Sequence, residues 1–308
     1  MPERARLGAL QIGSDPAGTA ATLAAILGHR DAIAAARLDV LVLPEAVLGG
    51  YPKGSDFGVR LGYRTAEGRA AFQRYWQQAI TMDGPEVAAL CELARDCRTA
   101  LVVGAIERAG ATLFCVAIFI DATGQFIGCH RKLMPTAAER LVWGQGDGST
   151  LTVMDTAAGR VGSAICWENY MPLLRTAMYA KGVEIWCAPT VDEREIWHAS
   201  MRHIACESRC FLITACQFQP AATTALDQPI TLRDRDETQA MIRGGSCIIS
   251  PYGELLAGPL CGEAGLLVAE VDRDEIVRAR FDLDATGHYA RPDVFRLTVD
   301  ERDTRGAG

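Results

Sequence analysis

Short, unbroken apolar runs are the feature that most restricts how this chain can fold. Residues 39–44 (DVLVLP) and 100–106 (ALVVGAI) are rich in aliphatic side chains, and similar runs occupy residues 7–12, 183–188 and 211–216. A strand that is covered on both faces has this continuous character, whereas a half-exposed strand alternates between apolar and polar residues. Segments with helical spacing separate the runs, at residues 20–37, 86–97, 173–181 and 196–207. The sequence therefore predicts strand–helix units around fully covered sheets.

Hairpin signals are mixed with these units. Residues 112–120 and 125–129 are joined by the turn sequence Asp121-Ala-Thr-Gly124. Further hairpins are predicted from residues 151–154 to 161–166 around Gly159, and from residues 246–250 to 266–271 through Pro251-Tyr-Gly253. This mixture favours an α/β sandwich of layered sheets and helices over a doubly wound parallel sheet. Residues 221–243 are polar and predict a long loop, and no linker divides residues 1–308, so we expect a single domain.

Composition argues against several classes of protein. The formal net charge of −7 is atypical of a nucleic-acid binder. No signal peptide and no apolar run of about eighteen residues is present, so we expect a cytoplasmic location and no membrane association. The eleven cysteines are odd in number and several, such as Cys115 and Cys247, stand in apolar runs, which predicts free thiols in the core. The five histidines form no metal-binding pair, and no dinucleotide or serine-hydrolase motif occurs, so we expect no metal and no cofactor.

Three polar residues stand at the ends of apolar runs, where α/β proteins often place reactive groups. Glu45 follows residues 39–44, Lys132 follows a hairpin strand, and Cys166 ends residues 161–166. Alone, each has an ordinary structural explanation: a surface carboxylate, a basic residue at a sheet edge, and one core cysteine among eleven. Cys166 differs from the other cysteines because a polar turn follows it, and the backbone N–H groups of that turn could point toward the thiol.

Taken together, three segments resemble the nitrilase superfamily of carbon–nitrogen hydrolases: Leu43-Pro-Glu45, His130-Arg-Lys-Leu133 and Cys166-Trp-Glu-Asn169. The resemblance covers nearly the whole chain and includes residues 49–54 (GGYPKG), 135–148 (PTAAERLVWGQGDG), 250–254 (SPYGE) and 287–293 (GHYARPD). It implies a four-layer α-β-β-α sandwich that pairs into a homodimer or a larger homo-oligomer. It also implies a catalytic triad of Glu45, Lys132 and Cys166.

The resemblance implies a role for each member of the triad. Cys166 is the expected nucleophile, Glu45 the general base, and Lys132 the cation that stabilises negative charge on sulfur and on the substrate. The backbone N–H of Trp167 is a candidate oxyanion donor. Glu139 resembles an additional carboxylate of the family that positions Lys132 or a water, although an exposed glutamate at a helix start explains it equally well.

Residues around the cysteine separate the branches of the superfamily. Residues 166–172 (CWENYMP) are similar to true nitrilases, which convert a nitrile and water to a carboxylic acid and ammonia through a thioimidate and a thioester. An amidase or carbamoylase with the same triad, and a non-catalytic binding protein on the same fold, are the alternatives. Ala137 stands where many nitrilases carry a histidine, so no role of that histidine transfers to this chain. Aromatic residues usually belong to the hydrophobic core. Four of them are nevertheless candidates to line an apolar substrate pocket: Tyr51, Trp143, Trp167 and Trp186.

Overall fold

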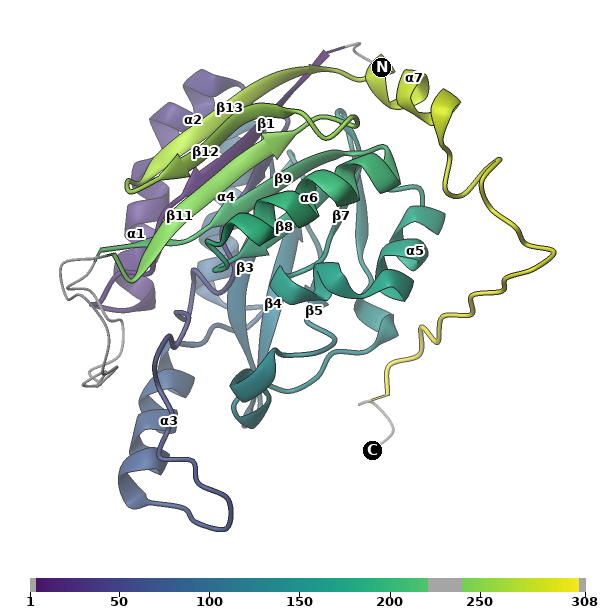
Figure 1. The fold of residues 1–308 in the computed structure, drawn as a ribbon. Helices are drawn as coiled ribbons and strands as arrows, with labels where there is room; N and C mark the ends of the chain where they lie inside the picture. The colour runs from purple at the N-terminus through teal and green to yellow at the C-terminus, as the bar shows by residue number, and fades with distance from the viewer. Residues whose placement is uncertain (1–3, 221–239, 305–308) are drawn as a thin grey trace.

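Two β-sheets form the centre of the molecule (Figure 1). The computed structural model describes residues 4–220 and 240–304. The first sheet contains β1 (Arg4–Gln11), β2 (Val40–Val42), β3 (Ala100–Ala109), β4 (Thr112–Ile120), β5 (Phe126–Arg131) and β13 (Gly265–Asp272), in the order β13-β1-β2-β3-β4-β5. The second contains β6 (Val153–Thr156), β7 (Gly159–Ser163), β8 (Ile185–Thr190), β9 (Phe211–Cys216), β10 (Phe218–Gln219), β11 (Ile242–Ile249) and β12 (Leu255–Cys261). Its order is β10-β11-β9-β8-β7-β6, with β12 paired to β11.

Helices cover the outer face of each sheet (Figure 1). The first sheet is covered by α1 (Thr19–Gly28), α2 (Arg30–Ala36) and α4 (Pro85–Cys97), and the second by α5 (Pro172–Ala180) and α6 (Glu195–Ser208). α4 begins with Pro85 in its first turn and ends at Cys97, and the next residue, Arg98, adopts the left-handed conformation common at helix ends. The helices predicted at residues 86–97, 173–181 and 196–207 are confirmed.

Three apolar layers hold the sandwich together, and they explain the unbroken apolar runs. Val40 and Val42 of β2 face the layer between the sheets, whereas Leu41 and the following Leu43 face the helices. In the second sheet, Cys187 of β8 faces the layer between the sheets and its neighbour Trp186 faces α5 and α6. β2 and β8 are thus buried on both faces, as a continuous apolar run requires. The predicted α-β-β-α sandwich is confirmed.

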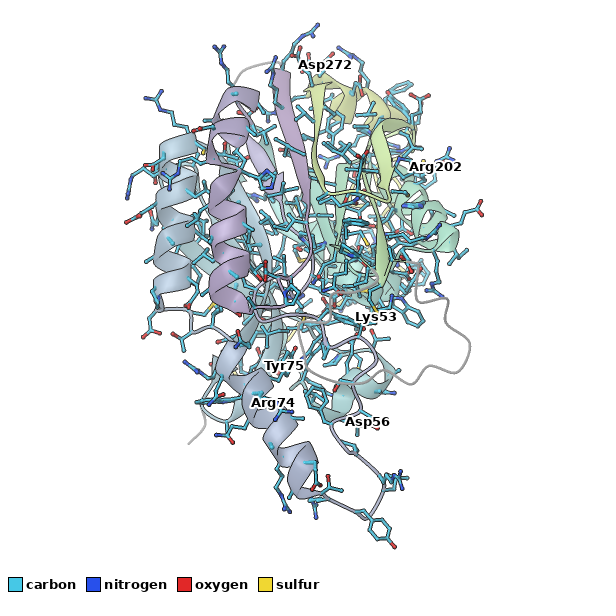
Figure 2. The ribbon with its side chains drawn as sticks, turned by 90° about the vertical axis from the view of Figure 1, so that its left-hand side faces the viewer. Lys53, Asp56, Arg74, Tyr75, Arg202 and Asp272 are labelled. Carbon is cyan, nitrogen blue, oxygen red and sulfur yellow. The ribbon has the colours of Figure 1, made fainter. Side chains whose placement is uncertain are left out.

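The helical regions differ from the prediction at three places. Residues 20–37 form two helices rather than one, because His29 has φ −85° and ψ 2° and interrupts the regular helix. The sequence pattern does not indicate α3 (Ala66–Gln78) or α7 (Asp274–Asp282), which are rich in charged and polar residues. The Thr65 hydroxyl caps α3 by accepting the Gly68 N–H at 3.0 Å. Figure 2 shows α3 extending away from the sandwich, with Tyr75 close to the body.

The last predicted hairpin is wrong, although the first two are confirmed by the β4–β5 and β6–β7 pairs. β11 pairs with β12, and β13 pairs with β1 in the other sheet. β12 is mostly exposed and contains Gly258 and Pro259, so it lacks an apolar run by which it could be recognised. Most of the predicted long loop at residues 221–243 lies outside the described residues. Within the part of the chain that the structure describes, no helix has both the length and the apolar character needed to cross a membrane.

Candidate active site

Glu45 lies just beyond the end of β2, where the backbone passes very close to β3. A Cβ atom at Gly104 would lie 2.1 Å from the carbonyl oxygen of Pro44 and 2.6 Å from the Cα of Glu45, so only glycine fits there. The Gln217 side-chain amide donates a 2.7 Å hydrogen bond to the carbonyl oxygen of Glu45. The Glu45 side chain is fully buried. The carboxylate is therefore fixed inside the molecule rather than exposed at a strand end.

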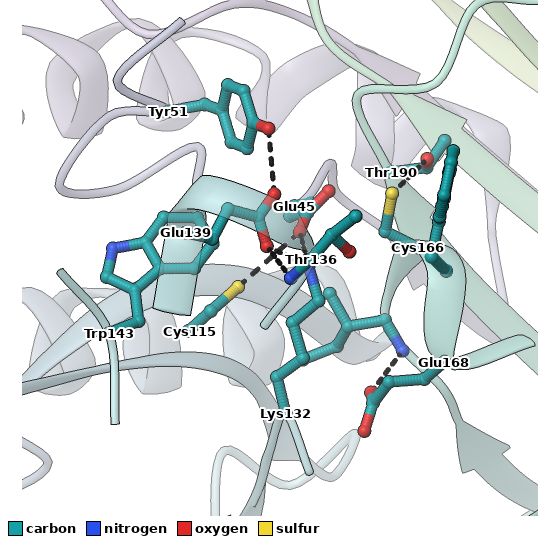
Figure 3. Close-up of polar contacts among 12 residues, drawn as sticks. Glu45, Tyr51, Cys115, Lys132, Thr136, Glu139, Trp143, Cys166, Glu168 and Thr190 are labelled. Atoms are coloured by element: carbon teal, nitrogen blue, oxygen red, sulfur yellow. Dashed lines mark hydrogen bonds and ion pairs between the residues drawn. The ribbon is translucent and has the colours of Figure 1, made fainter. Parts of the chain in front are cut away.

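Lys132 directly follows β5 and is also fully buried. Its backbone N–H donates to the carbonyl oxygen of Cys115 at 2.8 Å, which holds it beside β4. Its Nζ donates to Glu45 Oε1 at 2.7 Å and to Glu139 Oε2 at 2.9 Å (Figure 3). Burial alone would lower the pKa of Lys132, but the negative charges around it, Glu45 foremost, raise that pKa well above its usual value. Lys132 is therefore a cation held between two carboxylates.

Glu139 is held in place by a short turn. It belongs to η1 (Ala137–Leu141), a 3₁₀ helix that begins after Thr136. Its Oε2 accepts the Thr136 N–H at 2.6 Å, and its Oε1 accepts the Tyr51 hydroxyl at 2.8 Å. Burial, and next to it the charge of Glu139, raises the pKa of Tyr51, so this hydroxyl stays a donor. Glu139 is therefore a fixed partner of Lys132 and not an exposed residue at a helix start.

Cys166 stands in a sharp turn after β7. The strand ends at Ser163, earlier than predicted, and Cys166 opens the 3₁₀ helix η3 (Cys166–Tyr170) with φ 51°. Left-handed conformations are uncommon for residues other than glycine and often occur at functional sites. The Thr190 hydroxyl, at the end of β8, donates to Cys166 Sγ at 3.2 Å. Burial raises the pKa of the Cys166 thiol, the charge of Glu45 adds to this rise, and Lys132 opposes it. A thiol whose pKa is raised in this way needs a base to become a nucleophile.

The fold brings Glu45, Lys132, Glu139 and Cys166 together from four separate segments (Figure 3). Glu45 Oε1 is bound by Lys132, whereas Glu45 Oε2 is buried and has no hydrogen-bond partner among residues 4–220 and 240–304. Burial raises the pKa of Glu45, while Lys132 and, more weakly, the Cys166 thiol lower it. A buried carboxylate oxygen with a raised pKa and no partner is suited to accept a proton.

A cavity of about 440 Å³ opens beside these residues. Cys166 and Glu139 line it together with Tyr51, Trp143 and Trp167, three of the four aromatic residues predicted for a pocket. The rings of Tyr51 and Trp143 meet edge to face, with centroids 5.8 Å apart. The other walls mix apolar and charged side chains, which include Phe57, Val142, Val191, Lys53, Asp192, Glu193 and Arg194. The cavity can hold a small organic molecule against the thiol.

Trp186, the fourth predicted pocket residue, does not line this cavity. It is fully buried between the second sheet and its helices. Its indole N–H donates to Asn169 Oδ1 at 2.7 Å, and the Asn169 amide group donates to the carbonyl oxygens of Ala164 and Cys166, both at 2.8 Å. Trp186 therefore supports the turn that carries the thiol from outside the cavity.

Trp167 reaches the cavity with its side chain, which is 42% exposed. Its indole N–H donates to Asp192 Oδ2 at 2.9 Å, and the Arg194 guanidinium lies 5.1 Å from the ring centroid. Arg194 also binds Asp192 through two nitrogens. Hydrogen bonds from Arg194 and Trp167 hold the pKa of Asp192 below its usual value in spite of burial. The indole is thus clamped at the side of the cavity.

Two residues that touch the site carry no clear sequence signal. Cys115 Sγ lies 3.7 Å from Glu45 Oε1, yet nothing in the sequence separates Cys115 from the other cysteines in apolar runs. Thr190, the donor to Cys166, follows the apolar run at residues 183–188. The strand-end reasoning that selects Cys166 could also have selected Thr190.

The side chains that could bind a metal ion do not cluster in the part of the chain that the structure describes. Among the described residues, no group of three or more His, Cys, Asp or Glu side chains has an arrangement that could hold a metal ion. Two of the histidines have other partners, since His130 contacts Glu168 and His198 contacts the carbonyl oxygen of Gly245. All eleven cysteines are free thiols. The reactive groups of the site are therefore the Cys166 thiol and the Glu139 carboxylate, which line the cavity, and the buried Lys132–Glu45 pair bound to Glu139.

The chain matches a known protein family. The profile of the family described as carbon–nitrogen hydrolase matches residues 6–281. Among solved structures, the fold is similar to Nit3 of Saccharomyces cerevisiae, a member of the nitrilase superfamily, with a TM-score of 0.71 and 20% identity over 94% of this chain and 98% of that one. The NitFhit protein of Caenorhabditis elegans gives a TM-score of 0.72 and 18% identity, over 98% of this chain and 68% of that one.

Curated relatives are much more similar in sequence. A nitrilase of Bradyrhizobium diazoefficiens is 48% identical over 99% of this chain and 94% of its own length. An aliphatic nitrilase of Sinorhizobium fredii is 48% identical over 96% of both chains. A bifunctional nitrilase/nitrile hydratase of Lupinus angustifolius is 51% identical over 86% of this chain and 77% of its own. The chain therefore belongs to the carbon–nitrogen hydrolase family, within its nitrilase branch.

Proposed function

We propose that this protein hydrolyses an organic nitrile to the carboxylic acid and ammonia, with Cys166 as the nucleophile. The observation that carries this proposal is the buried Lys132–Glu45 pair, whose charges act on a thiol that lines a cavity of about 440 Å³. Nitrile as the substrate is supported by the names of the relatives, which are nitrilases or a bifunctional nitrilase/nitrile hydratase.

The first step is attack of Cys166 on the nitrile carbon. A nitrile carbon is a weak electrophile, and sulfur is the strongest nucleophile among neutral-pH side chains once its proton is removed. Glu45 takes the thiol proton as the S–C bond forms, and it then returns that proton to the nitrile nitrogen. The product is a thioimidate, in which the carbon is bonded to sulfur and doubly bonded to NH. The raised pKa of Glu45 fits both accepting and returning this proton.

Two water molecules complete the reaction. The first gives a proton to Glu45 while its oxygen adds to the thioimidate carbon, and Glu45 passes that proton to the nitrogen, which becomes NH₂. The proton of the new hydroxyl group then moves through Glu45 to the nitrogen, and the nitrogen leaves as ammonia as the C=O bond forms. A thioester remains. The second water attacks the thioester in the same way, and the C–S bond breaks as the thiol regains its proton. Nitrile and two waters thereby yield one carboxylic acid and one ammonia.

Lys132 supplies the positive charge that these steps require. Negative charge develops on the substrate nitrogen during the first attack and on oxygen during the later ones, and a fixed cation stabilises both. Glu139 holds Lys132 through its 2.9 Å contact, so that Nζ keeps its direction as charge moves. The backbone N–H of Trp167, which follows the thiol directly, is the second donor in this proposal.

The test is ammonia release over a matched panel of nitriles and amides, with the acid and the amide products quantified separately. Nitriles should be converted mainly to acid and should be faster substrates than the corresponding amides. If an amide is hydrolysed faster than every nitrile, the nitrile proposal is overturned and an amidase or carbamoylase is supported. Release of amide as the main product supports hydratase chemistry in place of full hydrolysis.

The nucleophile is tested with two cysteine variants. Cys166→Ala should abolish hydrolysis of every substrate. Cys247→Ala is the matched control, because Cys247 is a fully buried thiol on the far side of the second sheet and does not line the cavity. Hydrolysis by Cys166→Ala at the normal rate overturns the assignment of the nucleophile. If the unaltered protein binds nitriles or amides but converts none of them, a non-catalytic binding protein is supported instead.

A further inference from the structure

Glu168 is a buried carboxylate for which the reaction proposed above has no use. Its Oε1 accepts the Leu133 N–H at 2.6 Å, and its Oε2 accepts the Ile165 N–H at 2.8 Å. Leu133 directly follows Lys132, and Ile165 directly precedes Cys166. One carboxylate therefore joins the segment that carries the cation to the turn that carries the nucleophile, and Figure 3 shows Glu168 next to both.

His130 is the charged partner of Glu168. Its Nε2 lies 3.0 Å from Glu168 Oε2 and 3.2 Å from Oε1, and its Nδ1 lies 3.0 Å from the carbonyl oxygen of Thr150. A carbonyl oxygen can only accept a hydrogen bond, so Nδ1 carries a hydrogen, and Nε2 donates a second one wherever Glu168 is ionised. Glu168 of η3 is the charged group that faces the ring, and Thr150 of η2 (Gly148–Thr150) is its other partner. Burial alone would lower the pKa of His130, but the charge and hydrogen bonds of Glu168 raise it overall.

We propose that Glu168, held by a doubly protonated His130, is a positioning residue that sets the separation of Lys132 and Cys166. The proposal rests on the function proposed above for these two residues. Two backbone N–H groups and an imidazolium bind the carboxylate, so it cannot rotate without losing charged hydrogen bonds in a buried site. Displacement of a reacting group by about 1 Å can cost about a hundredfold in rate. The two sheets thus meet at one carboxylate whose geometry the reaction depends on.

Glu168→Gln is the variant that tests this role. It keeps the size of the side chain but replaces one acceptor oxygen with an NH₂ group, which cannot accept the N–H of Leu133 or Ile165. Its lost charge also leaves an imidazolium at His130 without a counterion. The fold of the variant is checked by circular dichroism and thermal unfolding before any rate is compared.

Glu107→Gln is the matched control. Glu107 is also a buried carboxylate, and it pairs with Arg131, the residue between His130 and Lys132 in the sequence. The Arg131 guanidinium lies over the ring of Phe114, 4.4 Å from its centroid, and does not bind the Cys166 turn. Loss of this pair should lower stability without changing the separation of Lys132 and Cys166.

The first readout is the reactivity of the thiol, which requires no substrate and therefore does not depend on the nitrile proposal. Iodoacetamide labelling of Cys166 is followed by mass spectrometry of the tryptic peptide 161–175, which contains no other cysteine. Glu168→Gln should slow this labelling by at least about tenfold, whereas Glu107→Gln should change it by less than about twofold. Equal rates for the two variants overturn the proposal.

The second readout separates positioning from general damage. With the best substrate of the ammonia-release panel, Glu168→Gln should lower kcat by about a hundredfold and change KM by less than about threefold, because Glu168 itself does not line the cavity. Glu107→Gln should retain kcat. A loss confined to KM, or equal losses of kcat in the two variants, overturns the positioning role.

The third readout is the protonation of His130 in the unaltered protein. The ¹⁵N spectrum of histidine-labelled protein is recorded at pH 7.5, and the His130 signals are identified by their loss in His130→Gln. Both ring nitrogens should be protonated. A neutral ring with one protonated nitrogen overturns the proposed state of the pair, even if the catalytic assignment of Cys166 is correct.

Discussion

Lys132 Nζ lies 2.7 Å from Glu45 Oε1, and both side chains are fully buried. A buried charge costs several kcal/mol unless a partner of opposite sign compensates it, so each residue needs the other to remain charged. Glu139 is the second partner of Lys132 and lines the cavity. The charge that serves the proposed reaction is therefore also part of what holds this region of the protein together.

Lys132→Met should lower the free energy of unfolding by about 3–5 kcal/mol, because it leaves Glu45 buried without its partner. The double variant Glu45→Gln/Lys132→Met removes both charges and should be more stable than Lys132→Met, yet still inactive. Urea unfolding followed by circular dichroism measures the stabilities. A double variant as unstable as the single one would show that the two charges do not depend on each other.

Substitution of Cys115 should change the pH at which activity falls on the acid side of the pH–rate profile, because Cys115 Sγ lies 3.7 Å from Glu45 Oε1. The pKa of Glu45 is raised, so the proposed base becomes protonated, and activity is lost, as pH falls through that raised value. Cys115→Ser supplies a stronger donor to the carboxylate and should move the acid limb of kcat/KM to lower pH. Cys115→Ala removes the donor and should move the limb to higher pH.

The profile of Cys247→Ala serves as the control for these two variants, because this buried thiol lies away from the cavity. Acid limbs that coincide for the Ser and Ala variants of Cys115 would mean that Glu45 is not the base.

Gly104→Ala should disable the site through the backbone. The new Cβ would lie 2.1 Å from the Pro44 carbonyl oxygen, so β3 or the Glu45 segment must shift. We expect a loss of about 1–3 kcal/mol in the free energy of unfolding, and a loss of activity that persists under conditions where the protein is fully folded. Gly28→Ala is the control: a Cβ there has no neighbour within 4 Å, and alanine favours the helix. Thermal unfolding and kcat together decide the outcome.

Thr190→Val should make the Cys166 thiol harder to ionise, because it removes the hydroxyl that donates to Sγ at 3.2 Å. Burial already raises the pKa of this thiol, and loss of the donor raises it further. The pH profile of iodoacetamide labelling of Cys166 should therefore shift to higher pH, with a loss in kcat/KM of about tenfold. Thr190→Ser keeps the hydroxyl and should retain the original profile. An unshifted profile in Thr190→Val would contradict this role.

The layers of the fold were predictable from the sequence because they depend on the local spacing of apolar residues. A strand buried on both faces must be apolar at every position, as Val40–Val42 is, and helical spacing marks α4 to α6. β12 and α3 were not predictable on this basis. β12 is mostly exposed, and α3 extends from the sandwich and buries few residues, so neither needs a regular apolar pattern.

The sequence by itself indicated the residues of the proposed triad, because Glu45, Lys132 and Cys166 follow apolar runs and stand in segments that resemble the nitrilase superfamily. Only the tertiary structure decided what surrounds them. Cys115 resembles an ordinary core residue in the sequence, and Thr190 is marked only by its place after an apolar run. Their contacts with Glu45 and Cys166 span 70 and 24 positions of the chain. The first contact forms within the first sheet and the second between the ends of the neighbouring strands β7 and β8, so both depend on how distant strands assemble into a sheet, which no local pattern encodes.

The same reason explains Trp186 and Glu168. An aromatic residue on β8 can face either side of the sheet, and packing against α5 and α6 places Trp186 behind the thiol turn rather than in the cavity. Glu168 lies within the motif that identifies Cys166, but its bonds to Leu133 and His130 exist only because the end of β5 meets that turn. Sequence determined the reactive groups, and the packing of the sheets decided the distances between them.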